Sequence, residues 1–396
     1  MKRVVFAFNS GIGFGGQGIA LQQAIAEFHA HHVLHKVYCY ATGKNISQDI
    51  PVDIFKAGSG LPDFLLRLPF LRKRQDLVFL MANQLFERFL TQEMTRTKGC
   101  DLFISTPGHA LDTMCALKSR YAAKVVIYSQ TTHIAYLFAQ LVREDATFAK
   151  RGRTHFVHEK LVEQVCKEYE RCDYIFVVSK FAYDTFRKQG IPEEKLRIVR
   201  PGVDLSRFVV APEKENAVFR ICFCGLACLR KGFQYLLQAV DELGNPDIEI
   251  VLVGASGDSV SHKLLEQYAQ KIKINRRFID PVAAYHYSDV LVLSSVEDGL
   301  GLVVPEAMSC GLPVIVSDHV GAQEMVTDGV DGFIVPTRDA QALKEKISLL
   351  FSDKPRRRAM SQMALKKREL FDQRITSRVC FETCQSLFES DHDKKN

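Results

Sequence analysis

The sequence predicts an α/β protein of two doubly wound domains that face a central cleft. Two observations carry this prediction. Strand-like and helix-like segments alternate along the chain, and the alternation restarts after a turn-rich segment at residues 205–217. The strand-like segments are apolar throughout, as expected of parallel sheets covered by helices on both faces. A length of 396 residues, 47% of them apolar, suits two or three folded domains.

The first domain is expected to span residues 1–205. Its first strand, at residues 4–8, leads through a glycine-rich turn, SGIGFGGQG, into the helix IALQQAIAEF. Further strands are expected at residues 102–105, 125–128 and 174–178, with the helix FVHEKLVEQVCKEYERC before the last of them. The linker follows, because RPGVDLSRF and VVAPEKEN carry Pro, Gly and charge but little that can form a core.

The second domain is expected to span residues 206–372, with residues 373–396 as a C-terminal helix. Its strands are FRICFC, IEIVLVG, DVLVLSS, PVIVSD and GFIVP, and its helices include KGFQYLLQAVDEL, VVPEAMSCG and DAQALKEKISLLFS. Ligands of such sheets bind beyond the carboxyl ends of the strands. We therefore expect functional residues in the loops that directly follow strands.

Charge and cysteine content indicate the partners and the cellular compartment to expect. Residues 1–205 hold 28 basic and 20 acidic residues, which indicates an anionic partner such as a membrane surface or a phosphorylated acceptor, or simply a mildly basic solvated surface. Eleven cysteines, an odd number, favour a reducing compartment. With no apolar run of about 18 residues and only five apolar residues after Lys2 and Arg3, we expect a cytoplasmic protein without a signal peptide.

No metal site is expected from the cysteines or histidines. Cys222, Cys224 and Cys228 form the tightest cysteine group, and no second pair follows at zinc spacing, so Cys222 and Cys224 are interpreted as core residues on one side of a strand. The histidines at positions 29, 31, 32 and 35 are interpreted as a helix end and surface.

The glycine-rich turn after the first strand suits a phosphate. Gly11, Gly13 and Gly16 have the G-x-G-x-x-G spacing of dinucleotide-binding sites, which keeps a nicotinamide-dependent dehydrogenase as an alternative. Against that alternative, HAHHVLHKVYCY has no Asp or Glu at the end of a second strand.

A second candidate loop is FCGLACLRKGFQYLL. Gly225 opens it, and Arg230 and Lys231 come just before a helix, where cations are unfavourable unless an anion lies nearby. The two cations suit a diphosphate leaving group. The alternative is a solvated pair at a helix start.

The most informative segment is DVLVLSSVEDGLGLVVPEAMSCGLPVIVSD. After a buried strand, the loop carries an acidic pair and two glycines: Glu297, Asp298, Gly299, Leu300 and Gly301. A helix begins near Val304, with Glu306 in its first turn. Backbone amides of such a loop can hold phosphate oxygens while its carboxylates accept sugar or ribose hydroxyls. Alternatively, Glu306 only complements the helix dipole.

Two histidines and one basic apolar segment complete the candidates. His133 and His109 each follow a first-domain strand and therefore face the cleft, either to contact a sugar or as loop histidines satisfied by backbone. Residues 61–74, LPDFLLRLPFLRKR, suit a membrane interface or a lipid-linked acceptor, or else a core-packed loop with a solvated basic end.

Taken with these loops, DGLGLVVPEAMSCGLPV resembles the signature of the family-4 retaining glycosyltransferases, which share the GT-B fold. The family motif is an acidic residue, seven intervening residues and a Glu, which map onto Asp298 and Glu306. FGGQGIALQQA, LRKGFQYLLQAV, DGVDGFIVPTRDAQAL and the segment CDYIFVVSKFAYDTFRKQGIPEEKLRIVRPGVDLSRF resemble other parts of the family in the same order.

The resemblance implies a retaining enzyme that moves a sugar from a nucleoside-diphosphate sugar to an acceptor, with no protein nucleophile, cofactor or metal. By resemblance, Glu306 binds the ribose, Asp298 holds sugar hydroxyls, and Arg230 and Lys231 bind the diphosphate. The other implied donor contacts are Gly16, His133, Gly301, Leu302 and Val303. Two departures stand out: Asp298 replaces the usual Glu, for which Glu297 can compensate, and Leu226 follows Gly225 where relatives have Arg.

The resemblance also implies that the last helices cross back onto the first domain. The acceptor is expected to be a glycan or a lipid-linked precursor, with peripheral contact to the inner face of an anionic membrane and no nucleic-acid partner. Two alternatives remain: a non-catalytic nucleotide-sugar-binding subunit of a partner enzyme, and a GT-B-type nucleotide-sugar epimerase.

Overall fold

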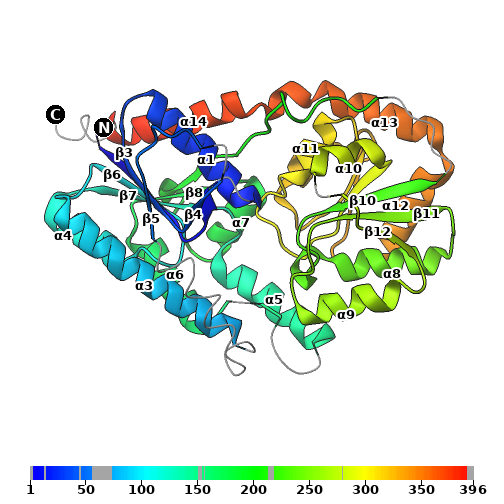
Figure 1. The fold of residues 1–396 in the computed structure, drawn as a ribbon, viewed down its shortest axis with the longest axis horizontal. Coiled ribbons are helices and arrows are strands. Elements are labelled where there is room, and N and C mark those ends of the chain that lie inside the picture. The colour runs from blue at the N-terminus through cyan, green and yellow to red at the C-terminus, as the bar shows by residue number, and fades with distance from the viewer. Residues whose placement is uncertain are drawn as a thin grey trace.

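The protein consists of two α/β lobes joined by two crossing segments (Figure 1). The structure is a computed structural model, and it describes residues 3–12, 15–43, 46–55, 74–149, 154–155, 157–212, 218–278 and 280–389. Gly13 of the glycine-rich turn, residues 61–73 of the basic apolar segment and residues 213–217 of the expected linker lie outside the described residues.

The first lobe is built on a seven-stranded parallel sheet with the order β5-β3-β1-β6-β7-β8-β9. Its central strands pair in register, with Val4 opposite Leu102 and Ala7 opposite Ser105. The strands are β1 (Val4–Ala7), β3 (Leu34–Cys39), β5 (Val52–Ile54), β6 (Leu102–Ser105), β7 (Lys124–Ser129), β8 (Tyr174–Val177) and β9 (Leu196–Ile198). A short separate pair joins β2 (Gly11–Ile12) to β4 (Ala41–Thr42).

Helices cover both faces of this sheet, which explains why its strands are apolar throughout. Phe6 of β1 packs edge-on against Phe28 on one face, whereas Val5 belongs to the opposite core together with Phe86. The helices are α1 (Gly15–Ala30), α3 (Gln75–Arg96), α4 (Leu111–Tyr121), α5 (Ile134–Phe148), α6 (Glu159–Arg171) and α7 (Lys180–Lys188), with a 3₁₀ turn at Glu193–Lys195.

The second lobe repeats the plan with a six-stranded parallel sheet ordered β12-β11-β10-β13-β14-β15. Its strands are β10 (Phe219–Cys224), β11 (Ile248–Val253), β12 (Lys273–Asn275), β13 (Val290–Leu293), β14 (Val314–Ser317) and β15 (Gly332–Val335). Its helices are α8 (Phe233–Leu243), α9 (Ser259–Tyr268), α10 (Pro281–Tyr287), α11 (Val303–Ser309), α12 (Ala340–Ser352) and α13 (Lys354–Lys366). Three 3₁₀ turns lie at Leu229–Lys231, Gly321–Met325 and Arg368–Phe371.

The chain crosses between the lobes near residue 203 and again near residue 372, and the two crossings are bonded to each other. The amide of Val203 donates to the carbonyl of Phe371 at 2.7 Å, and the amide of Gln373 donates to the carbonyl of Val203 at 3.0 Å. Beyond the second crossing, α14 (Gln373–Glu389) packs along α1, where Phe381 meets Phe28 at 5.2 Å between ring centroids.

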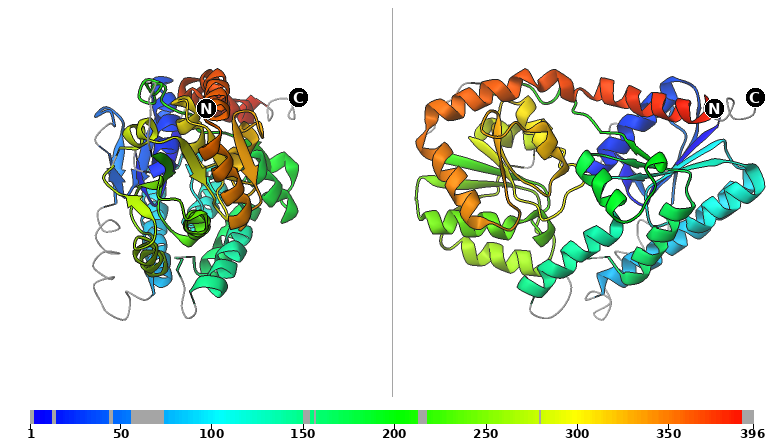
Figure 2. Two further views of the ribbon diagram at one scale, coloured as in Figure 1. Left: turned by 90° about the vertical axis from the view of Figure 1, so that its right-hand side faces the viewer. Right: turned by 180° about the vertical axis from the view of Figure 1, so that it is seen from behind.

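Two helices therefore bridge the lobes at opposite edges of the molecule. Figures 1 and 2 show α14 along one edge and α5 reaching from the first lobe to the second along the other. The two sheets turn their carboxyl ends toward the space between these bridges, so loops that follow strands in either lobe meet there.

The predicted fold class, two doubly wound α/β units, is confirmed. One helix start was wrong: α1 begins at Gly15, earlier than the predicted IALQQAIAEF segment, so Gly16 lies in the first turn of the helix rather than in a loop. The cost of glycine in a helix, about 1 kcal/mol, is small beside the burial of the apolar face of α1 that follows. Among the described residues, no helix is long and apolar enough to cross a membrane.

Candidate active site

The loop between β13 and α11 lies against the first lobe, and its Glu297 is fully buried there. The carboxylate accepts hydrogen bonds from the amide and hydroxyl of Thr132, at 3.1 and 2.8 Å, in the loop that follows β7. Its other oxygen pairs with the guanidinium of Arg230 at 3.0 Å, and the same guanidinium nitrogen donates to the Glu297 carbonyl at 3.1 Å. Glu297 thus connects the first lobe to the 3₁₀ turn Leu229–Lys231 of the second lobe, which we call the basic turn.

The neighbouring carboxylate, Asp298, is paired with the second cation of that turn. Its Oδ2 accepts a hydrogen bond from the ammonium of Lys231. Burial opposes the charged form of Asp298, but Lys231 and Arg230 outweigh it and hold the pKa of the carboxyl below its ordinary value. The anion that the sequence required beside these cations is present within the chain as the acidic pair.

Two positions of the loop require glycine, because neighbouring atoms lie where a Cβ would be. A Cβ on Gly299 would lie 2.3 Å from the carbonyl oxygen of Gln130 in the first lobe, and the carbonyl of Gly299 accepts a hydrogen bond from Ser179 Oγ at 2.6 Å. Gly301 has φ +80°, and a Cβ there would meet Leu293 at 2.7 Å. The loop therefore packs directly on first-lobe backbone at Gly299.

Glu306 has a different environment from the acidic pair. It lies in the first turn of α11, is buried, and accepts a hydrogen bond from the hydroxyl of Tyr285 at 2.9 Å. Burial raises the pKa of Glu306 to about 7, and the Tyr285 hydrogen bond and the charge of Arg207 only partly oppose this. The carboxyl is therefore divided between its protonated and ionised forms near neutral pH.

Glu306 opens onto a cavity of about 730 Å³ between the lobes. The wall on the first-lobe side is α1, the second-lobe side contributes Leu302 and Glu306, and the crossing segment contributes Asp204 and Arg207. This volume falls within the range of small-molecule sites. The cavity is lined by the carboxylates of Glu27, Asp204 and Glu306 and by the guanidiniums of Arg207 and Arg374, around a space large enough for a nucleotide-sized ligand.

The two candidate histidines are both buried and neutral. His133 is the N-cap of α5: its Nδ1 accepts from the amide of Ala135 at 3.2 Å, its ring packs against the rings of Tyr169 and Phe186, and burial lowers its pKa to about 4. His109 is wholly buried, with a pKa also lowered to about 4, and its Nε2 lies 3.1 Å from Ser105 Oγ. Burial therefore favours the neutral imidazole at both positions at pH 7.

The structure thus divides the predicted residues into groups. Four form the ion pairs at the lobe interface, Arg230 with Glu297 and Lys231 with Asp298, and Gly299 packs on first-lobe backbone beside them. Leu302 and Glu306 line the cavity, and Val303 begins α11. Leu300 is a core residue, Gly225 has φ +131° with open space where a Cβ would be, and Gly16 lies in α1.

Three residues at these contacts were missed from the sequence. Thr132 and Ser179 lie within three residues of the carboxyl ends of β7 and β8, so the rule that ligands bind beyond these ends could have found them. Tyr285 comes from α10, and no local pattern in PVAAYHY marks it as the partner of Glu306.

All eleven cysteines are free thiols, and Cys222 and Cys224 lie in one core cluster, as the sequence predicted. Within the described ranges there is no group of three His, Cys, Asp or Glu side chains that could hold a metal ion.

Two parallel α/β lobes, joined so that an acidic, glycine-rich loop faces the cleft, define a protein of GT-B type. Comparison with known families agrees along most of the chain. The model of glycosyl transferases group 1 matches residues 207–367, and that of glycosyltransferase family 4 matches residues 14–207. The chain belongs to this family of glycosyltransferases.

Individual relatives are more distant. A D-inositol 3-phosphate glycosyltransferase of Corynebacterium urealyticum is 31% identical over 227 residues, which cover 50% of this chain and 54% of the relative. The chain spans about half the length of several curated relatives it matches. The N,N'-diacetylbacillosaminyl-diphospho-undecaprenol alpha-1,3-N-acetylgalactosaminyltransferase of Campylobacter jejuni is 26% identical over 69% of this chain and 74% of its own.

Solved structures share the fold over almost the whole chain. Sucrose-phosphate synthase from Thermosynechococcus elongatus has a TM-score of 0.75 at 18% identity, covering 98% of this chain and 100% of its own. Anabaena Alr3699/HepE in complex with UDP and glucose has a TM-score of 0.71 at 18% identity, covering 98% and 100%. These likenesses establish the GT-B architecture.

Proposed function

We propose that the protein is a retaining glycosyltransferase that transfers a sugar from a nucleoside-diphosphate sugar to an acceptor bound mainly by the first lobe. The observation that carries this proposal is Glu306, a carboxylate positioned by Tyr285 at the wall of the cavity between the lobes. In a member of this family, that carboxylate is suited to accept the ribose hydroxyls of the donor.

The proposed chemistry uses positioning and charge rather than a protein nucleophile. The bond from the anomeric carbon to the diphosphate oxygen breaks, the acceptor oxygen bonds to the same face of that carbon, and the acceptor proton passes to the leaving phosphate. Arg230 and Lys231 supply positive charge toward the leaving diphosphate, and Asp298, ionised at pH 7, accepts sugar hydroxyls. His133 can take part only as a neutral imidazole.

We further propose a UDP-sugar donor and a lipid-linked or surface-glycan acceptor. The donor proposal is supported by the UDP complexes of Anabaena Alr3699/HepE, and the acceptor proposal by the undecaprenol-diphosphate substrate named for the Campylobacter relative. The excess of basic over acidic residues within residues 1–205 supports contact with an anionic acceptor or the inner face of a membrane.

A nucleotide-binding panel tests the proposal. Calorimetry and thermal shift with UDP, GDP, ADP, their sugar conjugates and NAD should show selective binding of one nucleoside diphosphate. Glu306→Ala should weaken that binding and lose most transfer activity while the protein stays folded. Glu345→Ala, at an exposed position of α12, is the control and should behave like the wild type.

Each alternative gives a distinct result in the same panel. Binding of NAD alone indicates a dehydrogenase. Nucleotide binding without transfer or hydrolysis indicates a non-catalytic subunit. Interconversion of the donor sugar without any acceptor, followed by NMR, indicates an epimerase. Activity of Glu306→Ala near the wild-type level would remove Glu306 from the site.

A further inference from the structure

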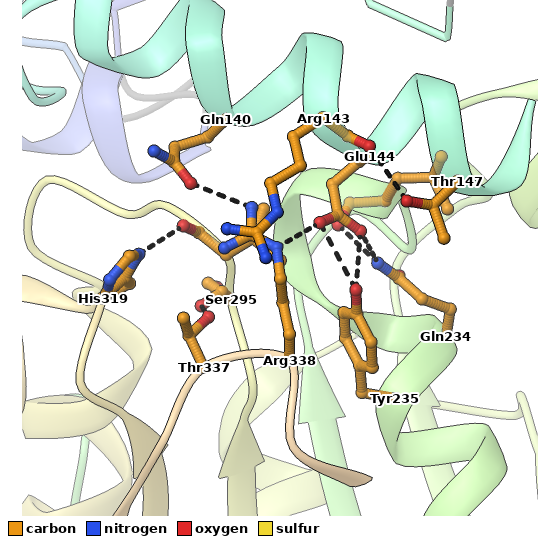
Figure 3. A network of polar contacts seen from close by, with 12 residues as sticks. Gln140, Arg143, Glu144, Thr147, Gln234, Tyr235, Ser295, His319, Thr337 and Arg338 are labelled. Atoms are coloured by element: carbon orange, nitrogen blue, oxygen red, sulfur yellow. Dashed lines mark hydrogen bonds and ion pairs between the residues drawn. The ribbon is translucent and has the colours of Figure 1, made fainter.

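A second polar network joins the lobes on α5, away from the acidic loop. Glu144 of α5 is 1% exposed, and its carboxylate accepts from three second-lobe side chains (Figure 3). Arg338 Nε donates at 2.6 Å, Gln234 Nε2 at 2.9 Å and the hydroxyl of Tyr235 at 3.0 Å. A carboxylate so buried is stable only while these partners stay in place, so the network requires the lobes in this relative position.

The second lobe maintains Arg338 in an unusual conformation for this contact. Arg338 follows β15 and has φ +66°, a left-handed backbone conformation that residues other than glycine rarely adopt. Its guanidinium lies between two residues of α5: Nε donates to Glu144, and Nη2 donates to Gln140 Oε1 at 2.9 Å. Figure 3 shows the guanidinium enclosed by α5 on one side and its own loop on the other.

The network is connected to the ion pairs of Arg230 and Lys231 by two routes. Gln234 Nε2, which donates to Glu144, also donates at 3.0 Å to the carbonyl of Leu229, in the 3₁₀ turn that carries Arg230 and Lys231. The second route is α5 itself. Thr132, which binds Glu297, lies just before the N-cap of α5, and eleven helical residues, Ile134 to Glu144, place Glu144 about 16 Å further along the same rigid element.

We propose that Glu144 is a positioning residue for glycosyl transfer. Together with Arg338 it fixes the angle between the lobes. This keeps Glu297, Asp298 and the basic turn in their positions relative to the first lobe. Contacts at both ends of α5 resist rotation as well as sliding of one lobe on the other: Thr132 binds Glu297 just before the helix begins, and Glu144 binds Arg338 near its far end. They act together with the Tyr136–His319 and Ser179–Gly299 contacts between the lobes. Glu144 itself touches neither the cavity nor the proposed donor residues, and its role rests on the transfer activity proposed above.

The test combines Glu144→Gln and Arg338→Gln with their double variant. Without the ion pair, fewer molecules have the lobes closed. The apparent affinity for the donor then falls in proportion to the fraction of closed molecules. With UDP-glucose as the probe and UDP release as the signal, we expect KM to rise about tenfold in each single variant while kcat changes less than about twofold. The double variant should resemble either single variant.

A merely structural role would give the opposite pattern. Loss of folded enzyme lowers kcat and leaves KM unchanged, and that result would overturn the proposal. Glu345→Gln makes the same chemical change at an exposed position of α12 and should match the wild type in both constants.

Small-angle scattering without ligand makes the test independent of the donor. The radius of gyration of both single variants should exceed that of the wild type and of Glu345→Gln, with the melting temperature changed by only a few degrees. Unchanged scattering of Glu144→Gln would overturn the proposal, whether or not UDP-glucose is turned over. Absence of UDP release by the wild type, with expanded scattering of the variants, would contradict the proposed donor and leave the lobe-positioning role supported.

Discussion

At the residue scale, the acidic side chains of this site are distinguished by their environments. The pKa of Asp298 is lowered because two cations outweigh its burial, and Glu306 has a pKa of about 7 because burial outweighs the Tyr285 hydroxyl donor and the charge of Arg207. The same two residues match the acidic positions of the family motif. The motif therefore joins a carboxylate whose pKa is lowered by two cations to one whose pKa is raised to about 7 by burial.

The titration of Glu306 predicts a pH-dependent stability. The folded-state pKa of about 7 exceeds the ordinary 4.5, so the stabilising contribution of this proton is complete below pH 4.5 and is lost as the pH rises through 7. Glu306→Gln keeps an acceptor for the Tyr285 hydroxyl but cannot ionise. In urea unfolding it should be more stable than the wild type by on the order of 3 kcal/mol at pH 8 and within about 1 kcal/mol at pH 5.

The comparison isolates this one carboxyl. Burial also raises the pKa of Glu87 to about 7 and that of Glu168 to about 8, but both residues are present in the variant and the wild type alike. A stability difference of the same size at pH 5 and pH 8 would show that Glu306 does not titrate in this range.

At the scale of single elements, α14 is the helix that ties the end of the chain to the first lobe. Phe381, 8% exposed, packs edge-on against Phe28 at 5.2 Å and stacks on His31 at 3.9 Å between ring centroids. The thiols of Cys380 and Cys384 are buried on the same face. These contacts hold α14 along α1.

Truncating that aromatic side chain should loosen the helix. Phe381→Ala is expected to lower the free energy of unfolding by about 3 kcal/mol, the usual cost of removing a buried aromatic ring. Val379→Ala, at a position of α14 that is 43% exposed, should change it by less than about 0.5 kcal/mol. Urea unfolding measures both, and equal effects of the two substitutions would show that α14 is not held by this face.

Element by element, the sequence revealed most of the interior strands and the edge strand β15, and it missed the three-residue edge strands. The apolar segments around Val4, Leu102 and Val290 are central strands, paired on both sides and covered on both faces, and their composition predicted them. The strands β5, β9 and β12 are edge strands of three residues each. An edge strand pairs on one side only and needs no apolar run, so composition carries little signal for it.

At the scale of the whole molecule, the site depends on how the lobes meet, which no local pattern encodes. The sequence located Glu297, Asp298, Arg230 and Lys231 in loops that follow strands, but it did not show that the cations would pair with the acidic residues. That pairing is fixed in part by Thr132, which precedes Glu297 by 165 residues. The order of strands therefore predicts the place of the site, and the lobe contact determines its charge arrangement.

Gly299 provides a prediction about the lobe contact. It lies outside the left-handed region, so alanine fits its backbone, but a Cβ would lie 2.3 Å from the carbonyl oxygen of Gln130 and 2.8 Å from Thr131 Cα in the first lobe. Gly299→Ala should therefore separate the lobes while each lobe stays folded. We expect a larger radius of gyration in small-angle scattering, a reduced turnover of the nucleotide sugar and a melting temperature within a few degrees of the wild type.

Gly232→Ala is the matched contrast, because its clash lies within one lobe. Gly232 has φ +67°, and a Cβ there would lie 1.8 Å from the carbonyl oxygen of Ser294 inside the second lobe. This variant should lose several kcal/mol of stability and melt well below the wild type, since both strain and overlap act on the lobe itself. If Gly299→Ala melted like Gly232→Ala, the glycine would serve the folding of its own lobe. If Gly299→Ala scattered and turned over like the wild type, the close contact with Gln130 would be dispensable for bringing the lobes together.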